Sequence, residues 1–152
     1  MSVEAVRAHL ARYGLSERIV VCETSSATVE LAAAVVGCEP ARIVKTLSFE
    51  AGDRCVLVAA SGDARVDNAK YKARFGVKAK MLKPDEAPQR TGHAVGGVCP
   101  FAVKDGVEVY LDESIRRFDW VYPAAGASDA VARLTVSELE RASGGTWVDV
   151  CK

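Results

Sequence analysis

The sequence predicts a single α/β (α+β) domain over residues 1–152, with a mixed, largely antiparallel, barrel-like sheet and helices around it. Three observations predict this class. Short β-rich runs alternate with helical segments along the chain, and no internal repeat or linker interrupts them. The length of 152 residues is typical of one domain. A composition of 49% hydrophobic and 26% charged residues is ordinary for a globular protein.

The first part of the chain predicts two helices and a short strand. Ser2 is expected to cap the first helix, and residues 19–23 to form a short buried strand. Residues 24–26 are then expected to supply capping hydroxyls for an alanine-rich helix that Gly37 ends. Pro40 opens a short helical segment, because the first turn of a helix tolerates its missing N–H.

Residues 42–49 predict a strand, because β-branched and aromatic side chains dominate the run. Strand side chains alternate between faces, so Lys45 shares the apolar face of Leu47 and Phe49. The Thr46 side chain points to the opposite face of the strand. Lysine is rarely buried without a partner, so Lys45 is either a snorkelling edge residue or a pocket lysine, and both interpretations stay open.

A hairpin and a further helix are predicted next. The turn signal at residues 51–53 connects to the continuous apolar run 55–60, which indicates a strand buried on both faces. Asp67 is expected to cap a helix that ends at Gly76. Residues 77–82 alternate as a half-exposed strand does.

The rest of the chain predicts short strands and helical turns. These are a helix or turn over 84–91, a strand over 107–112, helical turns over 113–118, and strands over 119–122 and 147–150. Thr135 and Glu138 have the spacing of a capping box for the last helix, which Gly144 and Gly145 end.

The composition disfavours several classes of protein. No run approaches the roughly eighteen apolar residues of a membrane helix, and the start lacks the pattern of a secretion signal. The five cysteines are widely spaced without a Cys-x-x-Cys pair, so they favour neither a zinc site nor a disulfide framework. We therefore expect a cytoplasmic protein without metal or cofactor.

The charge is unevenly distributed along a chain whose formal net charge is zero. Residues 65–90 carry eight Lys or Arg against three Asp or Glu. Such a segment can hold a phosphate backbone on one face of the protein. A solvated lysine-rich surface is the alternative.

Residues 91–101 predict a bent loop. Gly92, Gly96 and Gly97 permit conformations closed to other residues, and Pro100 restricts the chain further. The free N–H groups of such a bend can bind an anion, although glycine-rich segments are also common as tight turns.

Two residues of this loop indicate a second possible mechanism, nucleophilic catalysis. His93 and Cys99 have the types of a nucleophile pair. Cys99 stands directly before proline, however, and equally suits a small buried apolar residue. No Ser-His-Asp order, histidine cluster or carboxylate pair is found, and His9 is expected to be structural.

An ordered set of motifs spans roughly residues 20 to 150. The set comprises Thr28–Ala34 followed by Gly37, Ile43–Leu47, Ser61–Asp63 leading into Val66, Asp67 and Lys70, Thr91–Gly92, Gly96–Pro100, Leu111–Glu113, Phe118–Asp119 and Ala124–Gly126. In this order the chain resembles the YbaK / prolyl-tRNA-synthetase-associated editing-domain family of aminoacyl-tRNA deacylases.

The resemblance implies a trans-editing enzyme that hydrolyses the ester of a mischarged small amino acid (Ser, Thr, Ala or Cys class) on tRNA. It implies a catalytic group of Lys45, Gly96, Gly97 and Pro100. The implied substrate-binding residues are Ser26, Thr28, Val29, Phe49, His93, Val98, Cys99, Ala124, Ala125 and Gly126, with Ser25 beside them. In this setting Lys70, Lys72, Lys78 and Lys80 are the candidate ligands for the acceptor end of the tRNA.

Several alternatives stay open. A substrate ribose hydroxyl is implied as the group that activates water, and a prolyl-type synthetase as a further partner of a monomer or dimer. Members resembling the cysteine-specific deacylase carry a serine and an aspartate where this chain has Ala124 and Val131, so cysteine specificity is in doubt. The rival functions are a catalytically silent tRNA- or synthetase-binding module of the same fold, and a small-molecule thioester or ester hydrolase using Cys99.

Overall fold

The fold is organised around a long hairpin of β2 (Ile43–Ala51) and β3 (Arg54–Ser61). The computed structural model describes residues 3–23, 28–93 and 97–152. The other strands are β1 (Ile19–Val21), β4 (Glu108–Asp112), β5 (Trp120–Pro123), β6 (Ala130–Ala132), β7 (Leu134–Thr135) and β8 (Thr146–Val148). The α-helices are α1 (Val3–Ala11), α2 (Val29–Val36), α3 (Asn68–Phe75), α4 (Ala87–Thr91) and α5 (Val136–Ser143), and the 3₁₀ helices are η1 (Ser16–Arg18), η2 (Pro40–Arg42) and η3 (Glu113–Arg117).

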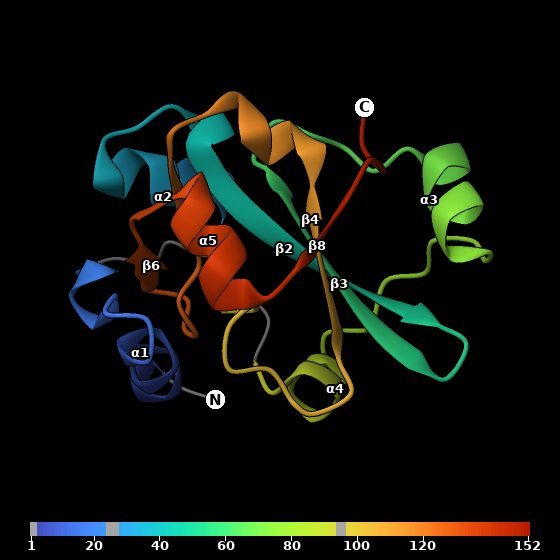
Figure 1. Cartoon of the computed structure of the whole chain (residues 1–152), viewed down its shortest axis with the longest axis horizontal. Coiled ribbons are helices and arrows are strands. Elements are labelled where there is room, and N and C mark those ends of the chain that lie inside the picture. The colour runs from blue at the N-terminus through green and yellow to red at the C-terminus, as the bar shows by residue number, and fades with distance from the viewer. Residues whose placement is uncertain (1–2, 24–27, 94–96) are drawn as a thin grey trace.

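Within the described residues, the main sheet has six strands in the order β7-β5-β2-β3-β4-β8, and β1 and β6 form a separate antiparallel pair. The longest ladder is the antiparallel hairpin. β5 joins β2 in parallel, and β4 joins β3 in parallel, because the long connections before these strands carry the chain back across the sheet. The curled mixed sheet with helices around it confirms the predicted fold class (Figure 1).

Two apolar cores lie on opposite faces of the hairpin. Val44 faces the core that contains Leu139 of α5, whereas Phe49 faces the core that contains Tyr71 of α3. The Phe49 and Tyr71 rings lie 4.9 Å apart. Residues 55–61 of β3 are all buried, which confirms the prediction of a strand covered on both faces.

Several predicted helix ends are confirmed by their capping groups, whereas α2 is capped by Thr28 and not by residues 24–26, and Ser2 lies outside the described residues. Asp67 accepts hydrogen bonds from two backbone N–H groups at the start of α3. Thr135 and Glu138 form the reciprocal capping box of α5. Gly37 and Gly76 end α2 and α3 in the left-handed conformation that glycine favours.

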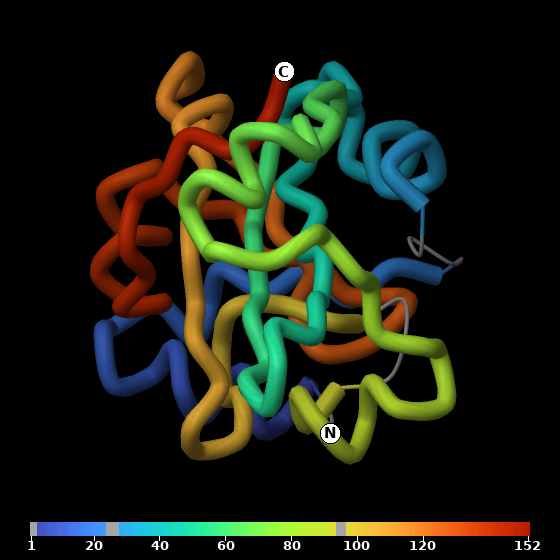
Figure 2. The backbone as a smooth tube through the Cα atoms, turned by 90° about the vertical axis from the view of Figure 1, so that its right-hand side faces the viewer, coloured from blue at the N-terminus to red at the C-terminus, as the bar shows by residue number. Residues whose placement is uncertain are grey.

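The predicted strand over 77–82 is wrong. Among the described residues, this segment meets the sheet at one bridge, Met81 opposite Phe49, and otherwise passes across the hairpin as a loop (Figure 2). Pro84 follows shortly and cannot donate to a ladder, so the pairing does not extend. The final strand also ends at Val148, two residues earlier than expected, and the short strands β6 and β7 were not anticipated.

Candidate functional site

The outer edge of β2 is unpaired in its middle. Among the described residues, β5 pairs with β2 at Ile43 and Val44 alone, and Leu82 N–H donates to the Ser48 carbonyl oxygen at 3.0 Å. Backbone groups on one edge recur at every second residue, so the N–H and C=O of Thr46 face this same edge. No described residue pairs with them. The main chain therefore presents a donor and an acceptor at this position.

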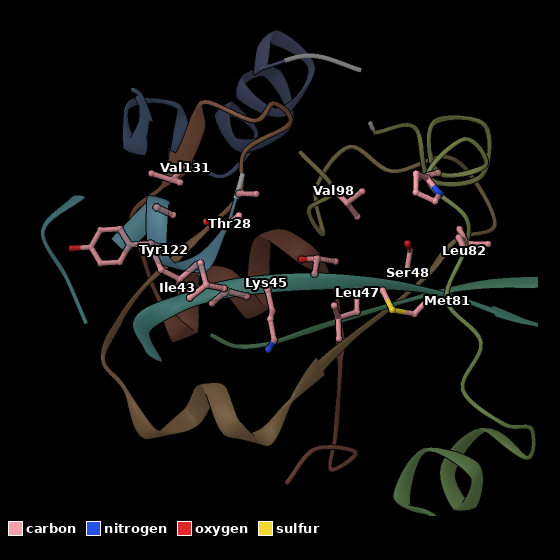
Figure 3. Close-up of a pocket in the computed structure, with 17 residues that line it drawn as sticks. Thr28, Ile43, Lys45, Leu47, Ser48, Met81, Leu82, Val98, Tyr122 and Val131 are labelled. Carbon is pink, nitrogen blue, oxygen red and sulfur yellow. The ribbon is translucent and has the colours of Figure 1, made fainter. Parts of the chain in front are cut away.

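A cavity of about 310 Å³ opens at this edge (Figure 3). Its lining comes from both faces of β2, since Ser48 points to one side of the strand and Lys45 to the other. The lining residues are Thr28, Val29, Ala32, Ile43, Val44, Lys45, Thr46, Leu47, Ser48, Met81, Leu82, Pro84, Ala87, Val98, Tyr122, Ala124 and Val131. This volume lies at the small end of the range for ligand pockets, so it suits a ligand of few atoms.

Thr46 contributes an unsatisfied hydroxyl to the cavity. Its Oγ1 is buried and has no hydrogen-bond partner among the described residues. Thr28 differs, because its Oγ1 accepts from the Leu31 N–H at 3.1 Å and caps α2. A buried polar group without a partner costs about 1–3 kcal/mol. The Thr46 hydroxyl is therefore a place where a polar ligand atom would be stabilised.

Lys45 lines the cavity from the face of β2 opposite to Val98 (Figure 3). Its ammonium is held by main-chain oxygens: Nζ donates to the Gly62 carbonyl at 3.3 Å and also to the Ala64 carbonyl. An ammonium has three N–H donors, so one remains for a ligand. This half-buried side chain therefore lies in the wall of the cavity, while its backbone pairs with Ala60 of β3.

Gly97 packs against the turn that follows β5. A Cβ on Gly97 would lie 2.7 Å from both the Ala127 nitrogen and the Gly126 carbonyl carbon, closer than any side chain permits. This backbone contact brings Val98 and Ala124 to the same cavity. The absence of a side chain at Gly97 is therefore explained by packing within the protein.

Several other predicted site residues do not line the cavity. Phe49 and Ala125 are buried in the two cores, 2% and 0% exposed, and Pro100 is buried below the bend. Gly96 and residues 25–26 lie outside the described residues. Of the predicted substrate-binding set, Thr28, Val29, Val98 and Ala124 are brought together at the cavity.

Cys99 and His93 lie side by side, but inside the protein. The Cys99 Sγ is 3.7 Å from the His93 Nε2, and both residues are 0% exposed. Nε2 lies 2.7 Å from the Phe101 carbonyl oxygen, which can only accept, so this nitrogen carries the proton and cannot take one from the thiol. Burial raises the pKa of Cys99 to about 12 and lowers the pKa of His93. The pair has neither the access nor the base that a nucleophilic site needs.

Ala124 and Val131 form a small apolar wall. They oppose each other in a β-bridge, and both line the cavity. Neither side chain offers a hydrogen-bonding group. These are the two positions at which the sequence differs from members that resemble the cysteine-specific deacylase. Both differences therefore lie in the wall of the cavity.

The four predicted RNA-binding lysines divide into two pairs. Lys70 and Lys80 are held by neighbouring carboxylates at 3.0 and 3.3 Å. Lys72 and Lys78 make no ion pair with any described residue, and both line a hollow of about 410 Å³ beside α3. Of these four side chains, the second pair is therefore the better placed to meet an external anion.

Sequence reasoning missed part of the cavity wall. Thr46, Tyr122 and the residues contributed by 81–87 were not singled out, although all line the cavity. The only available signal was the alternation in β2, which places Thr46 next to Lys45 and on the other face. Residues 81–87 approach β2 through tertiary contacts that no local pattern encodes.

In residues 3–23, 28–93 and 97–152, no group of three or more His, Cys, Asp or Glu side chains is placed to hold a metal ion. None of the helices in those ranges has the length and apolar character required to cross a bilayer.

Comparison with known proteins gives a consistent set of relatives. The aminoacyl-tRNA editing domain family matches residues 23–142. The uncharacterized protein YwhH of Bacillus subtilis (strain 168) is 46% identical over 100% of this chain and 98% of its own length. The proline–tRNA ligase of the same organism is 30% identical over 67% of this chain, which spans only 18% of that enzyme. A crystal structure of a candidate trans-editing enzyme for prolyl-tRNA synthetase has a TM-score of 0.90 and 30% identity, and covers 99% of this chain and 96% of its own.

Proposed function

Because the chain belongs to the aminoacyl-tRNA editing domain family, we propose that it is a trans-editing deacylase that hydrolyses the ester of a small, wrongly attached amino acid on tRNA. The observation that carries the proposal is the cavity at the unpaired edge of β2. The cavity, of about 310 Å³, has the Lys45 side chain on one face of β2, the unsatisfied Thr46 hydroxyl on the other face, and the free main-chain groups of Thr46 at the strand edge between them. These are the groups that an aminoacyl ester, with its amine and carbonyl, requires.

The reaction needs little chemistry from the protein. Water adds to the ester carbonyl carbon, the bond from that carbon to the ribose oxygen breaks, and the ribose oxygen takes up a proton. The products are the free amino acid and tRNA with its terminal hydroxyl restored. Negative charge develops on the carbonyl oxygen as water adds, and the Lys45 ammonium or the Thr46 N–H would stabilise it. A vicinal ribose hydroxyl is the proposed group that orients the water.

Selectivity follows from the size and polarity of the walls. Most lining residues are apolar, and Ala124 and Val131 are small, so the cavity favours a compact side chain. A larger cognate residue would be excluded by size, as in the second site of a double-sieve editing system. Polar discrimination is left to the hydroxyls of Thr46 and Ser48. We therefore place alanine, serine and threonine esters ahead of cysteine.

The experiment is a panel of tRNAs charged with alanine, serine, threonine, cysteine and proline, in which loss of the ester is followed over time. Wild-type protein should hydrolyse at least one small-residue ester and leave the prolyl ester intact. Lys45→Ala should lower that rate by about tenfold or more, because a charged hydrogen-bond donor to the developing oxyanion is lost. Equal survival of every ester with both proteins would reject the hydrolase function.

One observation favours a second function. The Lys45 ammonium is already bound by two carbonyl oxygens, an arrangement that also serves a purely structural lysine. A catalytically silent module that binds tRNA or a synthetase would keep this contact without chemistry. In that case the protein would bind uncharged and charged tRNA equally and leave every ester intact.

The proposed partners are the acceptor end of tRNA and a synthetase of the prolyl type, in the cytoplasm. The match to proline–tRNA ligases supports the second partner, because one part of each of these enzymes is similar in sequence to this chain. Lys72 and Lys78 support the first, since they make no ion pair with a described residue and are close in sequence to Met81 at the cavity.

A further inference from the structure

The turn formed by residues 61–64 holds the Lys45 ammonium. It follows β3 directly, and its Ala64 N–H donates to the Ser61 carbonyl oxygen at 3.0 Å. Two carbonyl oxygens of this turn, those of Gly62 and Ala64, accept from Nζ. The position of the ammonium therefore depends on the position of the turn.

A clamp of side chains fixes this turn from outside. Arg117 of η3 donates through Nη2 to Asp63 Oδ1 at 2.5 Å and through Nη1 to Oδ2 at 3.2 Å. The same Nη2 lies 2.7 Å from the Ser61 hydroxyl. Such a two-point guanidinium–carboxylate pair fixes direction as well as distance. The turn is thus bound at two of its four residues by one arginine.

Two further contacts connect the turn to its surroundings. The Ser61 N–H donates to the Ser114 Oγ at 3.1 Å, and the Ser61 hydroxyl lies 2.6 Å from the Ala41 carbonyl oxygen. There is no space for a side chain at Gly62, because a Cβ there would lie 2.1 Å from the Pro40 carbonyl oxygen. The turn is therefore pressed against the entry to β2, only a few residues before Lys45.

From this geometry we propose that Arg117 and Asp63 are positioning residues for Lys45: they fix the turn whose carbonyls orient the ammonium and leave its third N–H for the ester. The assignment rests on the proposed function in one respect, which is the catalytic use of Lys45. The orientation of the lysine by the clamp is independent of that function and is measurable by itself.

The first test is a double-mutant cycle on ester hydrolysis. Arg117→Ala should lower kcat/KM for the preferred ester by about fivefold, with the loss in kcat, because a half-exposed clamp of this type contributes modestly. In a Lys45→Ala background the same change should have less than about twofold effect, because the residue through which it acts is gone. Arg117→Lys, which keeps the positive charge but not the two-point geometry of the guanidinium, should restore part of the rate.

The matched control is Arg116→Ala. This neighbouring arginine lies 4.1 Å from the centre of the Trp147 ring and 3.5 Å from the Glu113 carboxylate, and makes no described contact with the turn. It should leave kcat unchanged in both backgrounds. A loss equal to that of Arg117→Ala would indicate a general effect of this helix and overturn the proposal.

The second test does not require enzymatic activity. The protein is treated briefly with acetic anhydride, and the acetylation of each lysine is measured by mass spectrometry. In wild type, Lys45 should react more slowly than Lys72, which has no described ion-pair partner. Arg117→Ala and Asp63→Asn should each raise the Lys45 rate about fivefold. Lys70, which is bound to Asp149 and to the Cys151 carbonyl, should not change, whereas general loosening would raise it too.

The outcomes separate the two proposals. If wild type hydrolyses no ester while the clamp variants raise Lys45 acetylation, the deacylase function fails and the positioning role stands. If hydrolysis is present but both variants leave the Lys45 rate unchanged relative to Lys72, the positioning role is rejected. A rise at Lys45 and Lys70 together rejects it as well.

Discussion

The backbones of Gly97 and Gly126 are so close that no Cβ fits between them. A methyl group on Gly97 would lie 2.7 Å from the Gly126 carbonyl carbon. The two glycines belong to segments that are far apart in the chain. Each segment carries a cavity residue, Val98 beside Gly97 and Ala124 two residues before Gly126. The contact therefore fixes the width of the cavity at this end.

Gly97→Ala should push these segments apart. We expect a loss of about 1–3 kcal/mol in the free energy of unfolding, the usual cost of overpacking a close contact. Discrimination between alanine and larger esters should fall as well, because the wall becomes wider. Urea denaturation and the mischarged-tRNA panel measure the two effects.

Gly106→Ala is the control for that change. Gly106 lies in an exposed turn at a φ of +86°, and a Cβ there would meet nothing within 4 Å. It should cost about 1–2 kcal/mol from backbone strain and leave ester selectivity unchanged. A Gly97→Ala protein with unaltered selectivity would show that this contact does not set the cavity width.

Thr46→Val should separate stability from function. Valine has nearly the same shape as threonine and removes the buried hydroxyl that has no described partner. The free energy of unfolding should therefore stay equal or rise by up to about 1 kcal/mol. If the hydroxyl contacts the substrate, kcat/KM should fall about fivefold or more.

Thr46→Ser is the matched variant, since it keeps the hydroxyl and loses only a methyl group. It should retain most of the activity of wild type. A fully active Thr46→Val protein would remove Thr46 from the substrate contacts, and a destabilisation of more than about 1 kcal/mol would mean that the hydroxyl has a partner within the protein.

Cys99 should be inert in the folded protein. Its thiol is 0% exposed, and burial raises its pKa to about 12, so it stays protonated near pH 8. Iodoacetamide should modify the partly exposed Cys38 first and leave Cys99 unmodified until the protein unfolds. Peptide mass spectrometry, with ester hydrolysis measured in parallel, checks this. Loss of hydrolysis that parallels modification of Cys99 would restore the thiol as a nucleophile.

The features predicted correctly for the fold are mostly local ones. The caps at Asp67 and Thr135 and the β2–β3 hairpin were predicted, because each depends on residues close together in the chain. The strand expected over 77–82 was wrong, because alternation alone cannot supply a partner strand. Tertiary packing decides that question.

The site was predicted in the same uneven way. Val98 and Ala124 were expected to share a pocket, and the structure brings both to the cavity. Phe49 was expected there too, but it lies closer to the hairpin turn than Lys45 and Leu47, which share its face of β2, and there it packs against Tyr71 of α3. The unsatisfied state of the Thr46 hydroxyl has no sequence signal at all, since it depends on what the rest of the protein leaves unpaired.

Asp63→Asn should make the free energy of unfolding depend less on pH in the acidic range. Hydrogen bonds from Arg117, followed by that from Ser61, lower the pKa of Asp63 from its usual 3.8 to about 2. A carboxyl with a lowered folded-state pKa stabilises the protein above pH 4, and this contribution is lost as the pH falls from about 4 to 2. The wild type should therefore exceed the variant at pH 7 by about 0.5–1 kcal/mol, a value reduced for a side chain that is half exposed.

Thermal unfolding at pH 7 and at pH 2.5 measures this difference for Asp63→Asn, and Asp53→Asn serves as the control. Asp53 lies in the exposed β2–β3 turn and makes no ion pair with any described residue. Its variant should follow the wild type at both values of pH. A gap between wild type and Asp63→Asn that stays constant with pH would mean that the clamp acts through shape and not through charge.

The lysines beside α3 allow a test with its control built into the chain. Lys72 and Lys78 make no ion pair with a described residue, whereas Lys70 and Lys80 are held by carboxylates. Replacing the first pair with alanine should weaken binding of a tRNA acceptor-stem duplex and lower the dependence of log K on log salt by about one for each phosphate that is no longer neutralised. Replacing the second pair should change both quantities less, because those ammonium groups must first leave their partners. Fluorescence anisotropy between about 50 and 200 mM salt measures both. Equal effects from the two pairs would mean that only the total charge of this surface matters, and no effect from either would place the RNA elsewhere.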